Sequence, residues 1–299
     1  MALTQWTAFV EVCRTGSIGG AAVALGYTQS AVSRQVAALE SDLQVRLLER
    51  LPRGVRPTPA GQALLRHAQI VVNEAERGRQ AVRDAVVASR HLAVGAVPSA
   101  ASTIVPAALA ALQVAGEAIR WSVVPALTQD LVAMVRQREV DLAVVTDAPP
   151  GLPAEPGVQA THVGDDEPVA VVPRHHPLAQ GSERRIRLQR LATERWIEDN
   201  AGSESMLRGM AARAGVPLQI DRSATDLLTK TGMVAAGHGV ALVPGLLVAA
   251  LRADVAVLRL VDAPARGIFV LRRAPGEQHE AFVRAIGVAV EAGQQTSSN

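Results

Sequence analysis

The stretch LGYTQSAVSRQVAALE, residues 25–40, combines helical periodicity with an unusual polar face. Its apolar positions recur at steps of four and three, so that they share one side of a helix; they are Val32, Val36 and Leu39. The other side lacks the mixture of Glu and Lys that commonly covers a solvated helix, and it carries Ser30, Ser33 and Arg34. The pattern predicts a helix with one face in a core and the other face against a partner.

Signals for further helices and turns surround this stretch in residues 1–58. An apolar stripe ends at Gly16, after which Ser17 can cap a second short helix. Gly26 then supplies a turn, and Thr28 can cap the quoted helix. Two short helices separated by a glycine-containing turn predict a helix-turn-helix.

The segment ERLPRGVRPTPAG, residues 49–61, follows the predicted helices. It contains several breakers of continuous helix, namely Pro52, Gly54, Pro57 and Pro59. Its basic residues are Arg50, Arg53 and Arg56. A turn-rich ribbon with three arginines at this place predicts the wing of a winged helix.

The polar face of residues 25–40 suits the base edges in a DNA major groove, which admits one α-helix. Arg can bind guanine through two hydrogen bonds, Gln can pair with adenine, and Ser can bond to a base or a phosphate. The residues that point away from the apolar stripe are Gln29, Ser30, Ser33 and Arg34. The alternative is a solvated face of chance composition. Because the turn, the cap and the wing agree, we expect this face to contact DNA.

Residues 60–89 follow as a proline-free helical segment. Apolar and small residues recur there at alternating steps of four and three, at Leu64, Ala68, Val71, Ala75, Gly78 and Val82. This heptad pattern is typical of a helix that pairs with a second helix, and the many small residues favour close packing. The alternative is a single amphipathic helix that lies on its own domain.

From residue 91 the periodicity changes to that of strands alternating with helices. Short, mostly apolar segments predict buried strands at 91–97, 140–146, 168–173, 239–244 and 267–273. Helical segments are predicted at 103–114, 129–138, 203–214, 225–236 and 277–291. The alternation predicts an α/β domain with substantially parallel sheets, in which ligands bind beside the carboxyl ends of strands.

The composition of the 299-residue chain indicates a globular protein with more than one domain. Hydrophobic residues make up 48% and charged residues 19%, and the net charge of +2 leaves room for a basic patch on one domain. Cys13 is the single cysteine, which excludes an internal disulfide and fits a reducing compartment. The N-terminal residues show no signal-peptide pattern, and charged residues interrupt each apolar run. We therefore expect a cytoplasmic protein with no membrane partner.

Two motifs of the N-terminal segment resemble those of the LysR-type transcriptional regulators, and the resemblance covers essentially the whole chain. The first motif is FVEVCRTGSIGGAAVALGYTQSAVSRQVAALESDL, and the second is the wing with Thr-x-Ala-Gly, RLPRGVRPTPAG. Further segments, MVAAGHGVALVP (233–244) among them, are similar to the effector domain of that family, though less closely.

The resemblance implies a mixed fold in three parts. An N-terminal, all-α winged helix-turn-helix at 1–59 precedes a long dimerising linker helix at 60–89. The C-terminal α/β domain at 90–299 is two-lobed and resembles a periplasmic binding protein, with lobe I at about 90–163 and 267–299. Lobe II covers about 164–266. Implied partners are double-stranded DNA with an interrupted palindrome, a small-molecule effector, further copies of the chain as dimer or tetramer, and RNA polymerase.

The residues expected to bind DNA combine the polar helix face with the matched positions of the wing. They are Thr28, Gln29, Ser30, Ser33, Arg34, Arg50, Arg53 and Thr58. Three positions depart from the family pattern, where Gly, an aromatic residue and Gly are common: Gln44, Leu48 and Arg138. We expect the loss of the first Gly to reshape the entry to the wing.

Hydroxyl and glycine residues between strands and helices are the candidates for an effector site. They are Ser99, Ser102, Thr128, Thr146, Gly202 and Ser203. Free N–H groups at helix starts favour an anion, so we expect a small effector that carries a carboxylate. For each hydroxyl, ordinary helix capping is an equally good explanation.

Other classes of function find little support in the sequence. There is no glycine-rich phosphate loop and no G-x-S-x-G nucleophile motif, so we expect neither an enzyme nor a cofactor. The adjacent His175 and His176 have no matching ligands at metal-binding spacing, so we expect no metal site. The remaining alternative is an architectural DNA-binding protein that responds to no ligand.

Overall fold

The structure, a computed structural model of the whole chain, describes residues 1–52, 54–87, 90–116, 118–181, 185–221, 224–261, 263–273 and 277–298. Contacts divide the chain into two compact units. The first comprises residues 1–91 with 137–139, and the second comprises 92–136 with 140–299.

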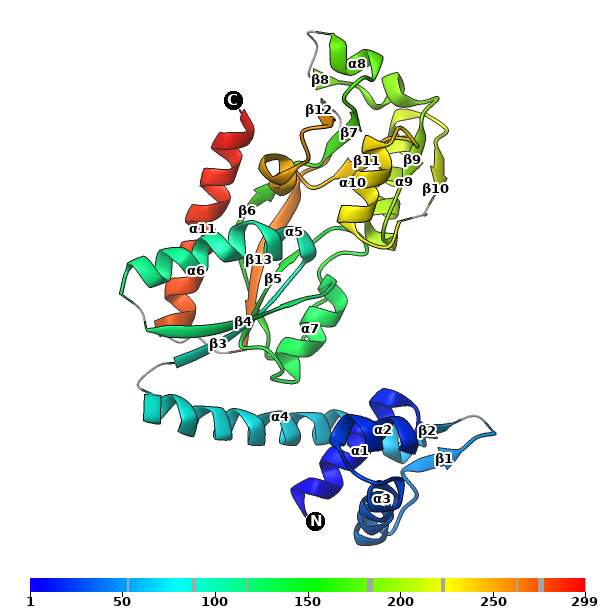
Figure 1. Cartoon of the computed structure of the whole chain (residues 1–299), viewed down its shortest axis with the longest axis vertical. Coiled ribbons are helices and arrows are strands. Elements are labelled where there is room, and N and C mark those ends of the chain that lie inside the picture. Colours follow the sequence, from blue (N-terminus) through cyan, green and yellow to red (C-terminus); the bar gives the residue numbers. More distant parts are fainter. Residues whose placement is uncertain are drawn as a thin grey trace. The chain divides into compact units, whose positions relative to one another are not determined.

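The first unit is a three-helix bundle with a wing, followed by one long helix (Figure 1). Its elements are α1 (Leu3–Thr15), α2 (Ile18–Leu25), α3 (Gln29–Leu43), β1 (Leu48–Arg50), β2 (Val55–Pro57) and α4 (Pro59–Val87). β1 and β2 form an antiparallel hairpin in which Leu48 pairs with Pro57. The core includes Phe9, Val12, Val32, Val36 and Leu39, so the apolar stripe of residues 25–40 is buried as predicted.

Local capping fixes the ends of the first three helices where the sequence predicts them. The Oγ atom of Ser17 accepts the backbone N–H of Gly20 at 2.9 Å, and Oγ1 of Thr28 accepts that of Ala31 at 3.2 Å. The turn between α2 and α3 passes through Gly26 with φ at 68°, a conformation that costs glycine nothing. The helix-turn-helix prediction is therefore confirmed in its details.

The entry to the wing differs from the sequence expectation. Gln44 takes the left-handed conformation that glycine usually supplies, with φ at 52°, and its N–H bonds to the carbonyl groups of Glu40 and Ser41. The helix end is thus kept although the residue is not glycine, and the expected reshaping of the entry is wrong. The conformation instead carries the steric cost that a Cβ atom brings there.

The predicted heptad seam of α4 is buried in its first part and exposed in its later part. Leu64 and Ala68 pack into the core of the first unit, and Ala68 is fully buried. Further along the helix, Val71 is 43% exposed and Val82 is 66% exposed. The early seam residues thus stabilise their own domain, whereas the later ones leave apolar surface uncovered in the single chain.

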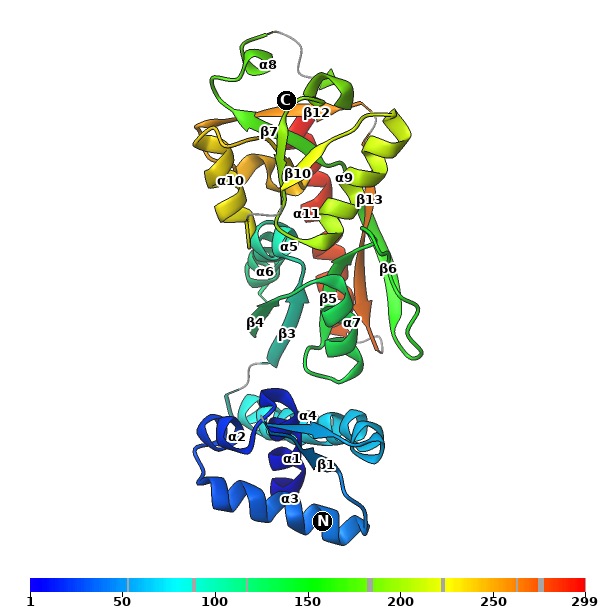
Figure 2. The ribbon, with the colours of Figure 1, turned by 90° about the vertical axis from the view of Figure 1, so that its right-hand side faces the viewer.

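The second unit contains two lobes that are built on separate sheets (Figure 2). Lobe I has a five-stranded sheet in the order β4-β3-β5-β13-β6. Its strands are β3 (Arg90–Ala96), β4 (Ile119–Pro125), β5 (Leu142–Thr146), β6 (Gln159–Asp166) and β13 (Arg266–Arg272). Its helices are α5 (Pro98–Ser102), α6 (Ile104–Val114), α7 (Thr128–Arg136) and α11 (Glu277–Ser298).

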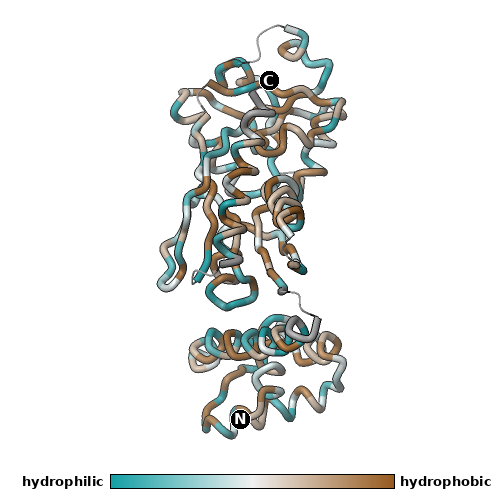
Figure 3. Tube along the Cα trace, turned by 90° about the vertical axis from the view of Figure 1, so that its left-hand side faces the viewer, coloured by the Kyte–Doolittle hydropathy of each residue, from teal (hydrophilic) through white to brown (hydrophobic). Residues whose placement is uncertain are grey.

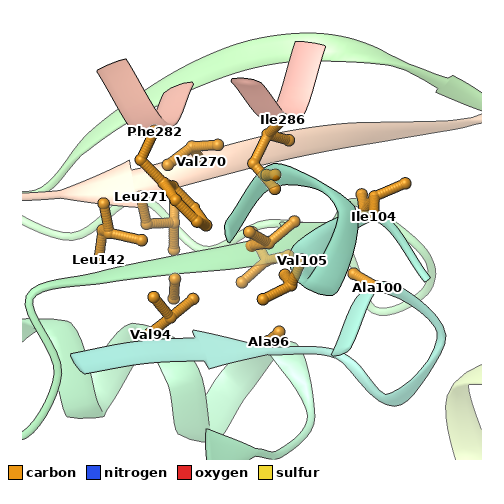
Figure 4. Packing of buried hydrophobic residues seen from close by; sticks show 14 of the residues in the cluster. Val94, Ala96, Ala100, Ile104, Val105, Leu142, Val270, Leu271, Phe282 and Ile286 are labelled. Carbon is orange, nitrogen blue, oxygen red and sulfur yellow. The ribbon is translucent and has the colours of Figure 1, made fainter. Parts of the chain in front are cut away.

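The core of lobe I lies between the sheet and helices α6 and α11 (Figure 4). Phe282 and Ile286 of α11 face Val270 of β13, and Val105 of α6 reaches the same cluster. All five residues of β5 are buried, which explains why its first four residues, Leu142 to Val145, are all apolar.

Lobe II has a four-stranded sheet in the order β11-β7-β12-β8, together with a separate parallel pair of strands, β9 and β10. Its strands are β7 (Val169–Pro173), β8 (Arg185–Ile186), β9 (Arg195–Ile197), β10 (Gln219–Asp221), β11 (Ala241–Val243) and β12 (Val255–Leu260). Its helical segments are α8 (Pro177–Gln180), η1 (Leu188–Leu191), α9 (Ala201–Ala214), α10 (Leu227–Ala235) and η2 (Gly245–Ala250). Alternate residues of β7 enter two different clusters, so this sheet is covered on both faces.

The prediction of substantially parallel sheets is wrong. Among the described strand pairs of the second unit, β3–β5, β8–β12 and β9–β10 are parallel. The pairs β5–β13, β6–β13, β7–β11 and β7–β12 are antiparallel. The reason is that the chain crosses between the lobes twice, from β6 to β7 and from β12 to β13. Of the strands that flank these crossings, β6, β7 and β13 run antiparallel to their described neighbours, and β12 runs antiparallel to β7 but parallel to β8. Figure 3 shows how hydrophobic and hydrophilic residues alternate along the chain.

Candidate DNA-binding surface and effector cleft

The polar face of α3 is open on the surface of the first unit. Gln29, Ser30 and Arg34 are exposed, and Ser33 is half-buried. The buried positions of α3 are Val32, Val36 and Leu39. The helix therefore presents the predicted polar side chains on the side that its core contacts leave free.

A hollow of about 510 Å³ lies between the second half of α3 and the wing. Its lining includes Ser33 of α3, Arg50 of β1 and Arg46 in the connection between them. Helix α3 and the wing thus share one surface that carries two arginines. Glu40 also lines the hollow, and its Oε1 atom accepts the N–H groups of Leu47 at 2.7 Å and Leu48 at 3.1 Å.

Two of the predicted DNA contacts, Thr58 and Thr28, use their hydroxyl groups within the first unit. The hydroxyl of Thr58 donates to the carbonyl of Arg46 at 2.8 Å and accepts the N–H of Gly61 at 3.0 Å, so it works within the fold. The hydroxyl of Thr28 is exposed but caps α3 and lies 3.0 Å from Oγ of Ser30. Arg53 lies outside the described residues.

The second unit contains a cleft of about 300 Å³ whose lining residues come from both lobes. Five of the six predicted effector residues line it, namely Ser99, Thr128, Thr146, Gly202 and Ser203. Ser102 does not line it, which corrects the sequence prediction. Its exposed hydroxyl donates to the carbonyl of Pro98 at 2.9 Å, a bond within α5.

On the lobe I wall of the cleft, the hydroxyl groups of Ser99 and Thr128 have different hydrogen-bond partners. Oγ of Ser99, which is buried, accepts a hydrogen bond from Nη2 of Arg266 at 3.0 Å. Oγ1 of Thr128 donates to the carbonyl of Thr146 at 3.0 Å, which ties the start of α7 to the end of β5. Arg266 pairs in turn with the buried carboxylate of Asp166, with Nη2 and Oδ2 at 2.7 Å.

The lobe II wall contains a fully buried lysine, Lys230 of α10. Its Nζ atom lies 2.5 Å from Oε2 of Glu198, 3.1 Å from Oδ1 of Asp199 and 3.3 Å from Oγ of Ser203. Glu198 is fully buried as well, and its Oε1 atom has no hydrogen-bond partner. Burial raises the pKa of the Glu198 carboxyl above its ordinary value, although the nearby Lys230 ammonium acts in the opposite direction.

Sequence reasoning missed the charged residues of this cleft. Lys230, Asp199 and Arg266 line it, and Asp166 and Glu198 stand behind them. The sequence contained one signal that could have drawn attention to Lys230, since it is the single lysine of the chain. The pairings themselves join residues far apart in sequence, such as Arg266 and Ser99, and no local pattern records them.

Other chemistry finds no support in the described parts of the chain. They contain no group of three or more His, Cys, Asp or Glu side chains that could hold a metal ion. His176 is used at the start of α8, where Nδ1 accepts the N–H of Leu178 at 3.2 Å. The thiol of Cys13 is half-buried in α1, and burial raises its pKa to about 11.

Within the described residues, no single helix has the length and apolar character to cross a bilayer. Helices α1 and α2 would meet that test only as a pair bent by 120°.

Comparison with known proteins gives the same two-part division. Residues 3–62 match the family model of the bacterial regulatory helix-turn-helix proteins of the lysR family, and residues 85–294 match that of the LysR substrate binding domain. The chain is 34% identical over 244 residues to a probable hydrogen peroxide-inducible genes activator of Mycobacterium avium, covering 79% of this chain and 76% of that one. It is 31% identical over 278 residues to the HTH-type transcriptional regulator TfdS of Cupriavidus pinatubonensis, covering 89% and 90%.

A structural likeness extends over both units. Full-length CbnR in complex with its target DNA has a TM-score of 0.71 to this chain at 23% identity, with 97% of this chain and 100% of that chain covered. The helix-turn-helix and the two-lobed domain define a DNA-binding transcriptional regulator with an effector domain. The chain belongs to the LysR family of transcriptional regulators.

Proposed function

We propose that this regulator reads an interrupted palindrome through α3 and responds to a small anion bound in the cleft of its second unit. The observation that carries the proposal is the exposed polar face of α3, which lies beside a wing that carries Arg50. LysR regulators bind DNA and small-molecule effectors and form oligomers. For this chain we propose which residues contact DNA, which residues line the effector site and what kind of effector is bound.

On DNA, we assign base contacts to Gln29, Ser30, Ser33 and Arg34. Arg34 can bind guanine through two hydrogen bonds, and Gln29 can pair with adenine. Arg50 contacts phosphates, and Arg53 is assigned to the backbone or the minor groove from its place in the wing motif. Thr58 is left out of the interface because its hydroxyl is used within the fold.

Two copies of the chain are needed to read two half-sites. The late part of α4 supports pairing, because Val71 and Val82 leave apolar surface uncovered. We therefore assign residues 60–89 as the dimerising segment between a DNA-binding domain at 1–59 and an effector domain at 90–299. Dimers pair again into tetramers in this proposal.

In the cleft, hydroxyl groups and helix starts favour an anionic effector. Helices α7 and α9 begin at Thr128 and Ala201, and both residues line the cleft. The positive end of a helix dipole stabilises a nearby negative charge. A small carboxylate that bridges the two lobes would meet these groups together with Ser99 and Ser203.

Binding must favour one arrangement of the two lobes to have any effect, because equal affinity for both arrangements would shift nothing. The favoured arrangement then changes the spacing of the DNA-binding units and the contact with RNA polymerase. Since the target is chromosomal DNA, we place this activity in the cytoplasm.

The test is a footprint of the purified full-length protein on DNA from its own genome, with and without the small-molecule fraction of a cell extract. The proposal expects discrete palindromic sites whose protection changes with the extract. The change should be absent in a Ser99→Ala/Ser203→Ala variant and present in the matched Ser102→Ala variant. Diffuse binding that the extract leaves unchanged would favour a ligand-independent architectural protein and would contradict the proposal.

A further inference from the structure

Helix α2 carries two adjacent glycines, Gly19 and Gly20, among its eight residues. A glycine inside a helix lowers the folding equilibrium constant roughly fivefold relative to alanine, because its backbone loses more freedom on folding. Neither residue has the positive φ that would favour glycine. Backbone conformation therefore does not explain why both positions lack a side chain.

The space around Gly20 explains that glycine through the cap of α2. A Cβ atom at Gly20 would lie 2.8 Å from Oγ of Ser17 and 3.0 Å from Cβ of Thr15. The same Oγ atom accepts the backbone N–H of Gly20 at 2.9 Å. The missing side chain thus leaves room for the cap, and Gly20 serves the fold of the first unit.

The space around Gly19 is limited by a different kind of neighbour. A Cβ atom there would lie 3.1 Å from Nε2 and 3.6 Å from Cδ of Gln29, the first residue of α3. Apart from the chain neighbours of Gly19 and the backbone of its own helix, no other described heavy atom lies within 4 Å of that position. The first distance is shorter than an ordinary van der Waals contact, so a methyl group would push the amide aside. The fold therefore has room for an alanine at residue 19 except where the Gln29 amide lies.

The Gln29 side chain lies against α2 by packing alone. It is exposed, and its amide makes no hydrogen bond among the described residues. Side chains on an α-helix lean toward the N-terminus, so at the start of α3 this one leans back toward α2. Ile18, the residue before Gly19, lines the hollow between α3 and the wing together with Ser33. The start of α2 thus borders the surface that we assign to DNA.

The position of the Gln29 amide matters for reading a base. Gln pairs with adenine through two hydrogen bonds, which fix both the place and the orientation of the amide. Hydrogen bonds weaken as their geometry departs from the optimum, and ordering a free side chain on binding lowers the affinity. A side chain that already lies in its reading position avoids both losses.

We propose that Gly19 is a positioning residue for DNA recognition: because it lacks a side chain, the Gln29 amide can lie against α2 in the conformation that reads a base. This inference rests on the proposed function of Gln29 as a base contact. It means that stability and specificity have opposite requirements at residue 19. An alanine there favours the folded state and weakens the reading of one base pair.

The experiment measures the affinity of the full-length protein for a palindromic site from its footprint and for every single-base change in one half-site. Gln29→Ala should reduce the preference at one base pair at least about fivefold. Gly19→Ala should reduce the preference at the same base pair at least about threefold, because the amide is displaced but still present. In the Gln29→Ala background, Gly19→Ala should cause no further loss, since the glycine acts through that amide.

Urea unfolding of the same proteins separates this role from a purely structural one. Gly19→Ala should raise the folding equilibrium constant by up to about fivefold while the base preference falls. The matched control is Gly287→Ala on α11, where a Cβ atom would meet no described atom within 4 Å. The control should also gain stability, but it should keep every base preference.

A Gly19→Ala protein that keeps the preference read by Gln29, or that loses preference at all base pairs alike, would overturn the inference alone. A loss of stability in Gly19→Ala would overturn it as well, because the fold itself would then need the glycine. If Gln29→Ala leaves the whole pattern of preferences unchanged, the proposed base contact is wrong and the inference falls with it.

Discussion

Oε1 of Glu40 on α3 accepts the backbone N–H groups of both Leu47 and Leu48 at the start of β1. This single oxygen ties α3 to β1 of the wing, so these two elements hold a fixed relation. Hydrogen bonds from two backbone groups to one carboxylate are stronger than bonds between neutral groups.

Glu40→Ala should therefore lower the free energy of unfolding by about 1–3 kcal/mol. The loss should be visible as a lower urea midpoint of the first unit. The matched control is Glu49→Ala, which removes only the exposed pair with Arg56 and should cost at most about 1 kcal/mol. An equal decrease in the free energy of unfolding of the two variants would show that the contact of Glu40 with β1 contributes no more than an exposed ion pair does.

Gln44→Gly should stabilise the protein by about 0.5–1 kcal/mol, because glycine adopts the left-handed conformation at the end of α3 without the cost of a Cβ atom. Urea unfolding of the full-length protein measures the change. Gln44→Ala keeps the Cβ atom and should give no gain. A loss in Gln44→Gly would mean that the bond from Nε2 of Gln44 to the carbonyl of Ser41 outweighs the strain.

Glu198 makes the stability of the second unit depend on pH. Its pKa in the folded protein is raised above the ordinary value of 4.5, chiefly by burial, so the folded state holds this proton more tightly than the unfolded state does. As pH rises above about 4.5, the stability contributed by that proton is progressively lost until the folded pKa is passed.

Glu198→Gln removes this dependence. The free energy of unfolding of the variant, minus that of the parent, should increase with pH from about 4.5 upward. Denaturant titrations at a series of pH values measure the difference. A difference that stays constant or falls with pH would show that the Lys230 ammonium outweighs burial at this carboxyl.

Cys13 distinguishes this chain from a sensor that uses thiol chemistry. Oxidation by peroxide begins at a thiolate, and burial raises the pKa of Cys13 to about 11, so the thiol stays protonated near neutral pH. A related chain is described as a probable hydrogen peroxide-inducible genes activator, but the single cysteine here lies in α1 of the DNA-binding unit.

We therefore expect iodoacetamide at pH 8 to leave native Cys13 unmodified and to alkylate it after unfolding. Peroxide should not change the DNA affinity of the native protein, and Cys13→Ser should behave as the parent does in that assay. A peroxide effect that Cys13→Ser abolishes would reverse the conclusion.

More of the first unit than of the second could be predicted from the sequence, because the features of the first unit are local in the chain. The caps at Ser17 and Thr28 and the stripe of Val32, Val36 and Leu39 are local, and local patterns predicted them correctly. The seam of α4 also follows from periodicity, although its early residues belong to the core of the first unit. The strand directions of the lobes depend on two chain crossings that no local pattern records.

In the cleft, too, local patterns predicted individual residues but not the partners that the fold brings to them. Hydroxyls between strands and helices could be placed at its rim from sequence, and Ser99 and Ser203 do line it. Ser102 could not be separated from Ser99 in advance, because only the three-dimensional course of α5 turns its hydroxyl back onto Pro98. Lys230 lies on α10, and its partners lie in the β9–α9 connection and on α9, segments that meet only in the fold.

We expect α3 to read bases and the wing to provide affinity without sequence choice. Arg34→Ala should weaken binding to the specific site by about 1–3 kcal/mol and flatten the base preference at one position. Arg50→Ala should instead weaken binding to all DNA sequences alike. It should also make the slope of log affinity against log salt concentration shallower by about one.

The most direct measurement is the affinity of the full-length protein and both variants for its palindromic site and every single-base change in one half-site. The preference at one base pair should disappear in Arg34→Ala and persist in Arg50→Ala. An Arg34→Ala protein that keeps the full pattern of preferences would contradict the assignment of α3 as the reading helix.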